Sequence, residues 1–89
     1  MNHAAIDTLG QRLGQAALTV LVRICPETRN ASNDQLEAAC VAMRAKSKQV
    51  VDDLLAYAKA APAMAEIAFQ TAALTLAQEG VRVLREIKR

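Results

Sequence analysis

Aromatic side chains are almost absent from this 89-residue sequence, which holds only Tyr57 and Phe69 and no tryptophan. Proteins that bind single-stranded nucleic acid stack its bases on aromatic rings, so this scarcity argues against that function. The sequence also has a single histidine, His3, and two separated cysteines, Cys25 and Cys40. A structural zinc site needs four closely spaced ligands, and a cysteine nucleophile needs a base beside it. We therefore expect no metal, no cofactor and no enzymatic activity.

Long apolar runs are missing as well. Polar residues such as Arg23 and Glu66 interrupt the most apolar segments, and none reaches the roughly 20 residues that span a bilayer. The N-terminus shows no basic leader followed by an apolar run, so we expect a cytoplasmic protein with no transmembrane segment. Eleven basic and nine acidic residues leave a net charge of +2, which does not demand a polyanionic partner.

Glycine and proline are scarce, with three and two residues respectively. Three segments, 4–24, 33–60 and 63–88, place apolar residues at the intervals of three and four that are typical of a helix face. Nineteen alanines favour helices, but alanine buries much less apolar area than leucine. We predict an all-α fold, with residues 1–89 forming one domain, an antiparallel three-helix bundle. Since this core is poor in large side chains, we expect a second chain to complete it.

The segment 33–60 has the most regular pattern. Its apolar positions alternate by four and three along the whole segment, which is a heptad seam with Ser47 as the one polar member. Ser32 and Gln35 have the spacing of a capping box, which predicts that the helix begins immediately after Ser32.

The segment 63–88 follows Pro62, a residue that suits the first turn of a helix. Gly80 is its weak point, where the helix is expected to kink or to give way to a short fourth helix. A hairpin about Pro62 pairs residue i of the second helix with a residue near 123 minus i of the third. This register predicts ion pairs of Arg44 with Glu79, of Glu37 with Arg85 or Arg89, and of Lys59 with Glu66.

Both cysteines flank the connector 25–32. Pro26 ends the first helix at Cys25, which we expect to be a partly exposed thiol, whereas Cys40 lies on the heptad seam as a small core residue. The helix from residue 32 to Cys40 rises about 12 Å, and a disulfide needs Cα atoms within about 7 Å, so no internal disulfide is expected. Asn30 begins an Asn-Ala-Ser acceptor pattern, which we interpret as a polar loop.

Gly10 and Gly14 stand four residues apart in the first helix. Each costs about 1 kcal/mol relative to alanine in a helix, so some contact should compensate. Antiparallel pairing of the first two helices places them opposite Met43 and Ser47. We therefore predict that the two helices pack closely at these glycines.

The first helix is too short to cover the far end of the hairpin, roughly residues 54–69. Both aromatics of the chain lie in this tip, and contiguous exposed apolar surface usually marks an interface. The predicted partner interface consists of Leu54, Leu55, Tyr57, Met64, Ile67 and Phe69.

These patterns predict a small non-enzymatic helical interaction module that self-associates, most simply as a homodimer, or binds a protein partner through the tip. One alternative is accessory binding of nucleic acid through Arg12, Arg44, Lys46, Lys48 and the basic C-terminus, although acidic neighbours and the lack of aromatics disfavour it. Another is peripheral association of the alanine-rich amphipathic faces with an apolar or lipid surface.

Overall fold

The computed structural model describes residues 3–87 as three long helices, α1 (His3–Ile24), α2 (Asn33–Ala60) and α3 (Ala65–Ile87). Two single turns of 3-10 helix, η1 (Pro26–Arg29) and η2 (Pro62–Met64), connect them. The chain is thus an all-α three-helix bundle, with principal extents of 41 × 23 × 16 Å. Residue 88, the predicted end of the third helix, lies outside the described residues.

The ends of α2 follow from local sequence. The Ser32 side chain accepts a hydrogen bond from the Gln35 backbone N–H, and the Gln35 side chain accepts one from the Ser32 N–H, which completes the predicted capping box. At the other end, the Ala61 N–H donates to the carbonyl of Tyr57 at 2.8 Å before Pro62 opens η2. Proline lacks the N–H that a continuing helix requires, so the chain turns there.

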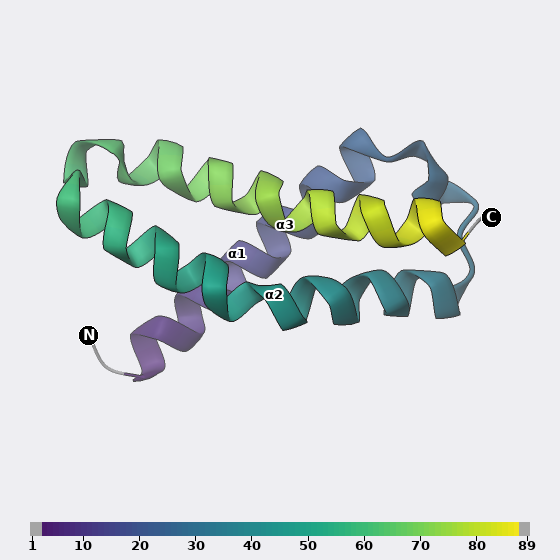
Figure 1. Ribbon diagram of the computed structural model, residues 1–89, viewed down its shortest axis with the longest axis horizontal. Helices are drawn as coiled ribbons and strands as arrows, with labels where there is room; N and C mark the ends of the chain where they lie inside the picture. Colours follow the sequence, from purple (N-terminus) through teal and green to yellow (C-terminus); the bar gives the residue numbers. More distant parts are fainter. Residues whose placement is uncertain (1–2, 88–89) are drawn as a thin grey trace.

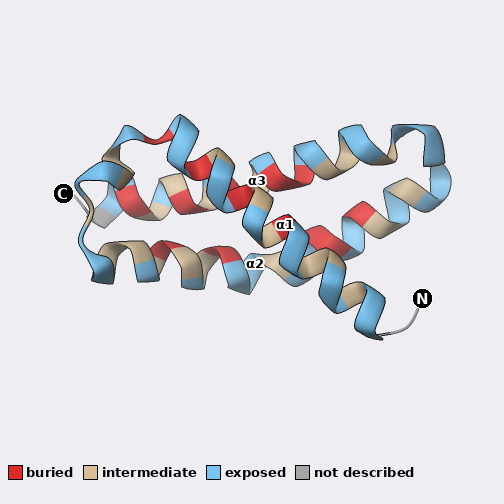
Figure 2. Ribbon diagram, turned by 180° about the vertical axis from the view of Figure 1, so that it is seen from behind, coloured by how far each residue is buried: buried red, intermediate tan, exposed pale blue. Residues whose placement is uncertain are grey.

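The helices do not all run alongside one another. Helices α2 and α3 form an antiparallel hairpin, whereas α1 crosses them obliquely and packs more extensively on α3 than on α2 (Figure 1). The N-terminal half of α1 leaves the hairpin and is mostly exposed or half-buried, as is the hairpin tip (Figure 2). The oblique crossing, more than the short length of α1, leaves the tip uncovered.

The core is built mainly from small and medium side chains. Buried residues come from all three helices and from the residue after α1, and five of them are alanines. They are Leu13, Ala17, Leu21, Cys25, Ala39, Met43, Val50, Val51, Leu54, Ala72, Ala73, Leu76, Ala77 and Leu84. The heptad seam of α2 is buried only at Met43, Val50 and Leu54, whereas its two ends are half-buried or exposed.

Of the three glycines, Gly80 has the closest neighbours on the other helices. A Cβ placed on Gly80 would lie 2.8 Å from Sδ of Met43 on α2 and 3.2 Å from Cδ2 of Leu21 on α1. Only glycine leaves enough room for both side chains. Helix α3 passes through Gly80 unbroken to Ile87, so no short fourth helix follows Gly80 within the described residues. The proximity of Gly80 to Met43 agrees with the predicted register of the hairpin.

Gly10 and Gly14 do not make the predicted close contact. A Cβ on either residue would meet nothing within 4 Å, so open space lies beside both. The prediction assumed that α1 runs antiparallel along α2, whereas α1 crosses the hairpin obliquely (Figure 1). The close approach that a glycine permits occurs at Gly80 instead.

Candidate interaction surfaces

The structure divides the six predicted interface residues into two groups. Tyr57, Ile67 and Met64 are exposed, with 51%, 56% and 39% of their surface accessible. Leu54 belongs to the core, so its expected exposure is wrong, and Leu55 and Phe69 are half-buried against the core. We use the name tip surface for Tyr57, Met64, Ile67 and the cleft described next.

A cleft of about 380 Å³ opens between α2 and α3 beside the tip. Tyr57 and Ile67 line it from opposite helices, Leu54 lies within it, and no residue of α1 takes part. Asp53 is its single charged residue, and threonines of α3 provide the other polar groups. The remaining lining residues are Val50, Ala68, Thr71, Ala72 and Thr75. The cleft is therefore an apolar slot with one carboxylate.

Helix α1 contacts the edge of the tip at Phe69. The guanidinium carbon of Arg12 lies 5.7 Å from the centre of the Phe69 ring, which is a cation–π contact. This contact joins the exposed half of α1 to the start of α3. Phe69 also packs against the core and is half-buried there.

A larger groove of about 830 Å³ lies between α1 and α2, and Leu76 of α3 is part of its lining. Gly10 and Gly14 line it from α1, where their missing side chains leave the open space noted above. The other lining residues are Ile6, Asp7, Gln11 and Leu18 of α1 and Cys40, Met43, Arg44, Ser47, Lys48, Val51 and Asp52 of α2. We call this feature the α1–α2 groove.

The basic residues of the nucleic-acid alternative do not gather on one surface. Arg44 and Lys48 line the α1–α2 groove together with Asp7 and Asp52, so that surface carries mixed charge. Arg12 faces Phe69 instead. Lys46 lies close enough to α3 to help lower the pKa of Glu79. Lys88 and Arg89 lie outside the described residues.

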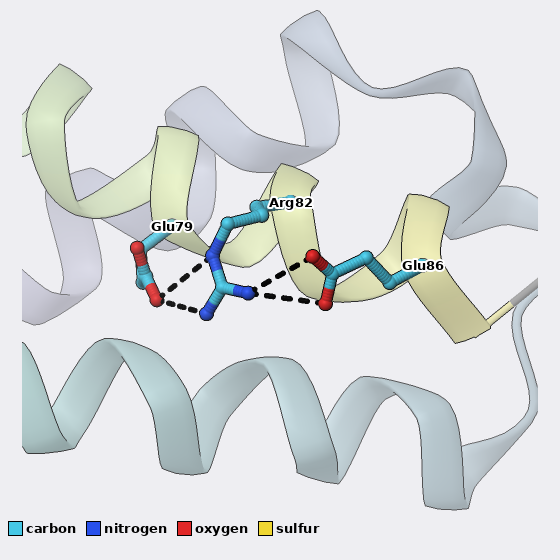
Figure 3. Close-up of polar contacts among 3 residues, drawn as sticks. All are labelled: Glu79, Arg82 and Glu86. Atoms are coloured by element: carbon cyan, nitrogen blue, oxygen red, sulfur yellow. Dashed lines mark hydrogen bonds and ion pairs between the residues drawn. The ribbon is translucent and has the colours of Figure 1, made fainter.

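Polar contacts on α3 run along the helix. Arg82 donates hydrogen bonds to the carboxylates of Glu79 and Glu86, one turn to either side (Figure 3). The hydrogen bond from Arg82 lowers the pKa of Glu79. These i,i+3 and i,i+4 pairs replace the predicted pair of Glu79 with Arg44.

The other two predicted interhelical ion pairs are also not formed within residues 3–87. Arg85 lies 4.0 Å from Glu27 of η1 rather than beside Glu37. Lys59 makes no ion pair with Glu66 in the described part of the chain. Arg89, the other predicted partner of Glu37, lies outside the described residues. The register of the hairpin is right, but Glu79 pairs within α3 and Arg85 lies beside η1 instead.

Cys25 is fully buried, and its Sγ donates a hydrogen bond of 2.8 Å to Oε2 of Glu27. Burial, together with the Glu27 carboxylate, raises the pKa of the Cys25 thiol. Cys40 is half-buried and lines the α1–α2 groove. The predicted exposures of the two cysteines are therefore reversed, because η1 folds back over the end of α1. Both cysteines are free thiols.

Within residues 3–87, no three or more His, Cys, Asp or Glu side chains cluster as metal ligands would. Across the same residues, every helix is too short or too polar for a bilayer crossing. Comparison of the chain with family models, curated proteins and solved structures found no match.

Sequence reasoning missed three features of these surfaces. Asp53 and Thr71 line the tip cleft, but nothing in the sequence marks which helix face opens there. The contact between Arg12 and Phe69 depends on the crossing angle of α1 and carries no local signature. The chain of Glu79, Arg82 and Glu86 could have been found from its helical spacing alone.

Proposed function

We propose that this protein is a non-enzymatic helical interaction module that binds another protein through the tip surface. The observation that supports it is the position of Tyr57 and Ile67, each about half exposed, on opposite walls of one apolar cleft. Isolated exposed apolar residues are common on proteins, but two that flank a cleft offer a site for an apolar side chain.

The charge around the tip favours a particular kind of partner. Residues 53–70 contain two acidic side chains, Asp53 and Glu66, and one basic side chain, Lys59. Two tips in contact would bring like charges together, which opposes a tip-to-tip homodimer. A partner segment with apolar side chains and a neighbouring lysine or arginine matches both the cleft and the Asp53 carboxylate.

Site-specific crosslinking tests this function. A photoreactive phenylalanine analogue at position 57 should crosslink a basic protein in the source cells, whereas the same analogue at position 22 should not. Val22 is the most exposed of the large apolar residues described, and it lies on α1 away from the tip cleft. The crosslinked protein is then purified, and its affinity for the full chain is measured by calorimetry.

We expect Ile67→Glu to weaken that complex at least about tenfold, as loss of a buried interface anchor does, and Val22→Glu to leave it unchanged. Equal affinity for both variants would contradict the role of the tip. Duplex DNA and vesicles of phosphatidylglycerol and phosphatidylcholine serve as probes of the two alternatives. Binding to DNA that falls steeply with salt and with Arg44→Glu, or flotation with the vesicles, would replace the proposal.

A further inference from the structure

The α1–α2 groove is a second candidate binding surface, separate from the tip surface. Gly10 and Gly14 lie along its α1 wall, while Met43 and Val51 line it from α2. The groove holds about 830 Å³ between the two helices. Two glycines inside a helix cost about 1 kcal/mol each relative to alanine, and a Cβ on either would meet nothing within 4 Å in this chain.

The α1 wall of the groove is self-complementary. Every fourth residue of α1 contributes to this wall, in the order Ile6, Gly10, Gly14 and Leu18. A large side chain therefore stands at each end, and two glycines lie between them. This order is the same in both directions along the helix. If two such walls meet antiparallel, the glycines face each other and each Ile6 faces the Leu18 of the other copy. The missing side chains then allow the two backbones to approach closely.

The charges of the groove are complementary under the same arrangement. Because η1 joins α1 and α2 at one end of the bundle, Asp7 and Asp52 lie towards one end of the groove, Lys48 lies one turn from Asp52, and Arg44 lies towards the other end. Asp7 and Arg44 are exposed, and neither forms an ion pair within the described residues. A two-fold axis between Gly10 and Gly14 brings the acidic end of each copy onto the basic end of the other.

We propose that a second copy of this chain binds in the α1–α2 groove, forming a symmetric dimer. Its two α1 helices run antiparallel, with their glycines in contact at the centre and Asp7 of each copy beside Arg44 of the other. The tip surfaces remain outside this interface. This assembly supplies the second chain that an alanine-rich core lacks, and it presents two tips for partners.

Charge reversal tests this dimer through the pair of groove residues. Sedimentation at micromolar concentration should show wild-type particles of twice 9.6 kDa. In the symmetric dimer, Asp7→Arg and Arg44→Asp each put like charges beside each other at both Asp7–Arg44 contacts. The dimer dissociation constant of each variant alone should therefore be at least about tenfold higher than that of the wild type. An equimolar mixture of the two variants should restore the dimer, because both contacts then pair opposite charges.

Controls separate this proposal from the tip-binding function. Ile67→Glu should remain dimeric, whereas Gly14→Leu should be monomeric and helical, since its Cβ meets nothing within 4 Å in one chain. A wild-type monomer at the highest soluble concentration would overturn the dimer and leave the groove to another chain. Failure of the mixed variants to associate, or loss of the dimer in Ile67→Glu alone, would also overturn it. None of these results bears on crosslinking at position 57.

Discussion

Met43 of α2 occupies the space where Gly80 of α3 would carry a side chain, with its Sδ 2.8 Å from the ideal Cβ position. Leu21 of α1 lies 3.2 Å from the same point. The three helices therefore pack closely against one another at Gly80, a residue without a side chain.

Substitution of this glycine should reduce stability. Alanine gains about 1 kcal/mol of helix propensity, but overpacking a filled core costs about 1–3 kcal/mol. Because Gly80→Ala displaces Met43 and Leu21 together, we expect a net loss of up to about 2 kcal/mol in the free energy of unfolding. Urea denaturation at a concentration where the chain is monomeric measures this change.

Gly14→Ala is the matched control, because its Cβ would meet nothing within 4 Å. It should stabilise the monomer by about 0.5–1 kcal/mol. Equal stabilisation by Gly80→Ala and Gly14→Ala would show that α3 does not pack as described.

The two thiols should differ in reactivity. Cys25 is fully buried and hydrogen-bonded to Glu27, whereas Cys40 is half-buried in the α1–α2 groove. An aromatic disulfide reagent should therefore label Cys40 first, and Cys25 only at the rate of unfolding. Single variants Cys25→Ser and Cys40→Ser assign the two phases. Faster labelling of Cys25 would contradict its burial beneath η1.

Alkaline pH should destabilise the fold through Cys25. Its pKa is raised above the ordinary value of 9.0, so the folded state keeps the proton more tightly than the unfolded state. This contribution is fully present below pH 9.0 and is lost as pH rises through the raised pKa. Urea midpoints across this range should fall less in Cys25→Ala than in wild type. Parallel curves for the two proteins would contradict the shift.

Acidic pH should also destabilise the fold, in this case through Glu79. Its lowered pKa means that the folded state favours the carboxylate, which stabilises the fold above the ordinary value of 4.5. The contribution is lost as pH falls through the lowered pKa. Glu79→Gln should therefore flatten the acid limb of stability against pH. Glu37→Gln is the control, since Glu37 is exposed and makes no ion pair within residues 3–87.

The Arg12 contact with Phe69 should hold the free half of α1 in place. Removing it with Arg12→Ala should cost about 0.5–1 kcal/mol, the range of partly exposed cation–π pairs. Hydrogen exchange should quicken in residues 5–14 while α2 remains protected. Arg23→Ala, an exposed residue of α1 on a different turn, should leave exchange in this segment unchanged. Unaltered exchange in Arg12→Ala would show that the contact does not restrain the helix.

Local features of this fold follow from sequence because their partners lie within a few residues. The capping box of Ser32 with Gln35 and the bounds of α2 depend only on neighbouring backbone, and both were predicted correctly. The crossing angle of α1 depends on the small residues at which a neighbouring helix packs closely. The sequence offers three glycines as candidates and does not distinguish Gly80 from Gly10 and Gly14.

The candidate surfaces depend on that angle, so their prediction was partial. Tyr57 and Ile67 are exposed, as the short length of α1 predicted, although the oblique crossing of α1 (Figure 1) contributes more to this exposure. Leu54 turns inwards, since α2 and α3 cover it without help from α1. The α1–α2 groove could not be foreseen from a pattern that assumed closely aligned helices.

Five alanines among the buried residues leave this protein little tolerance for enlargement at its centre. Each contributes one methyl group, so neighbouring helices come close and any larger replacement must push a whole helix aside. Substitutions are therefore tolerated mainly on the walls of the cleft and the groove, where side chains can vary without moving the helices. New binding specificities can therefore arise on its surfaces while its interior stays nearly fixed.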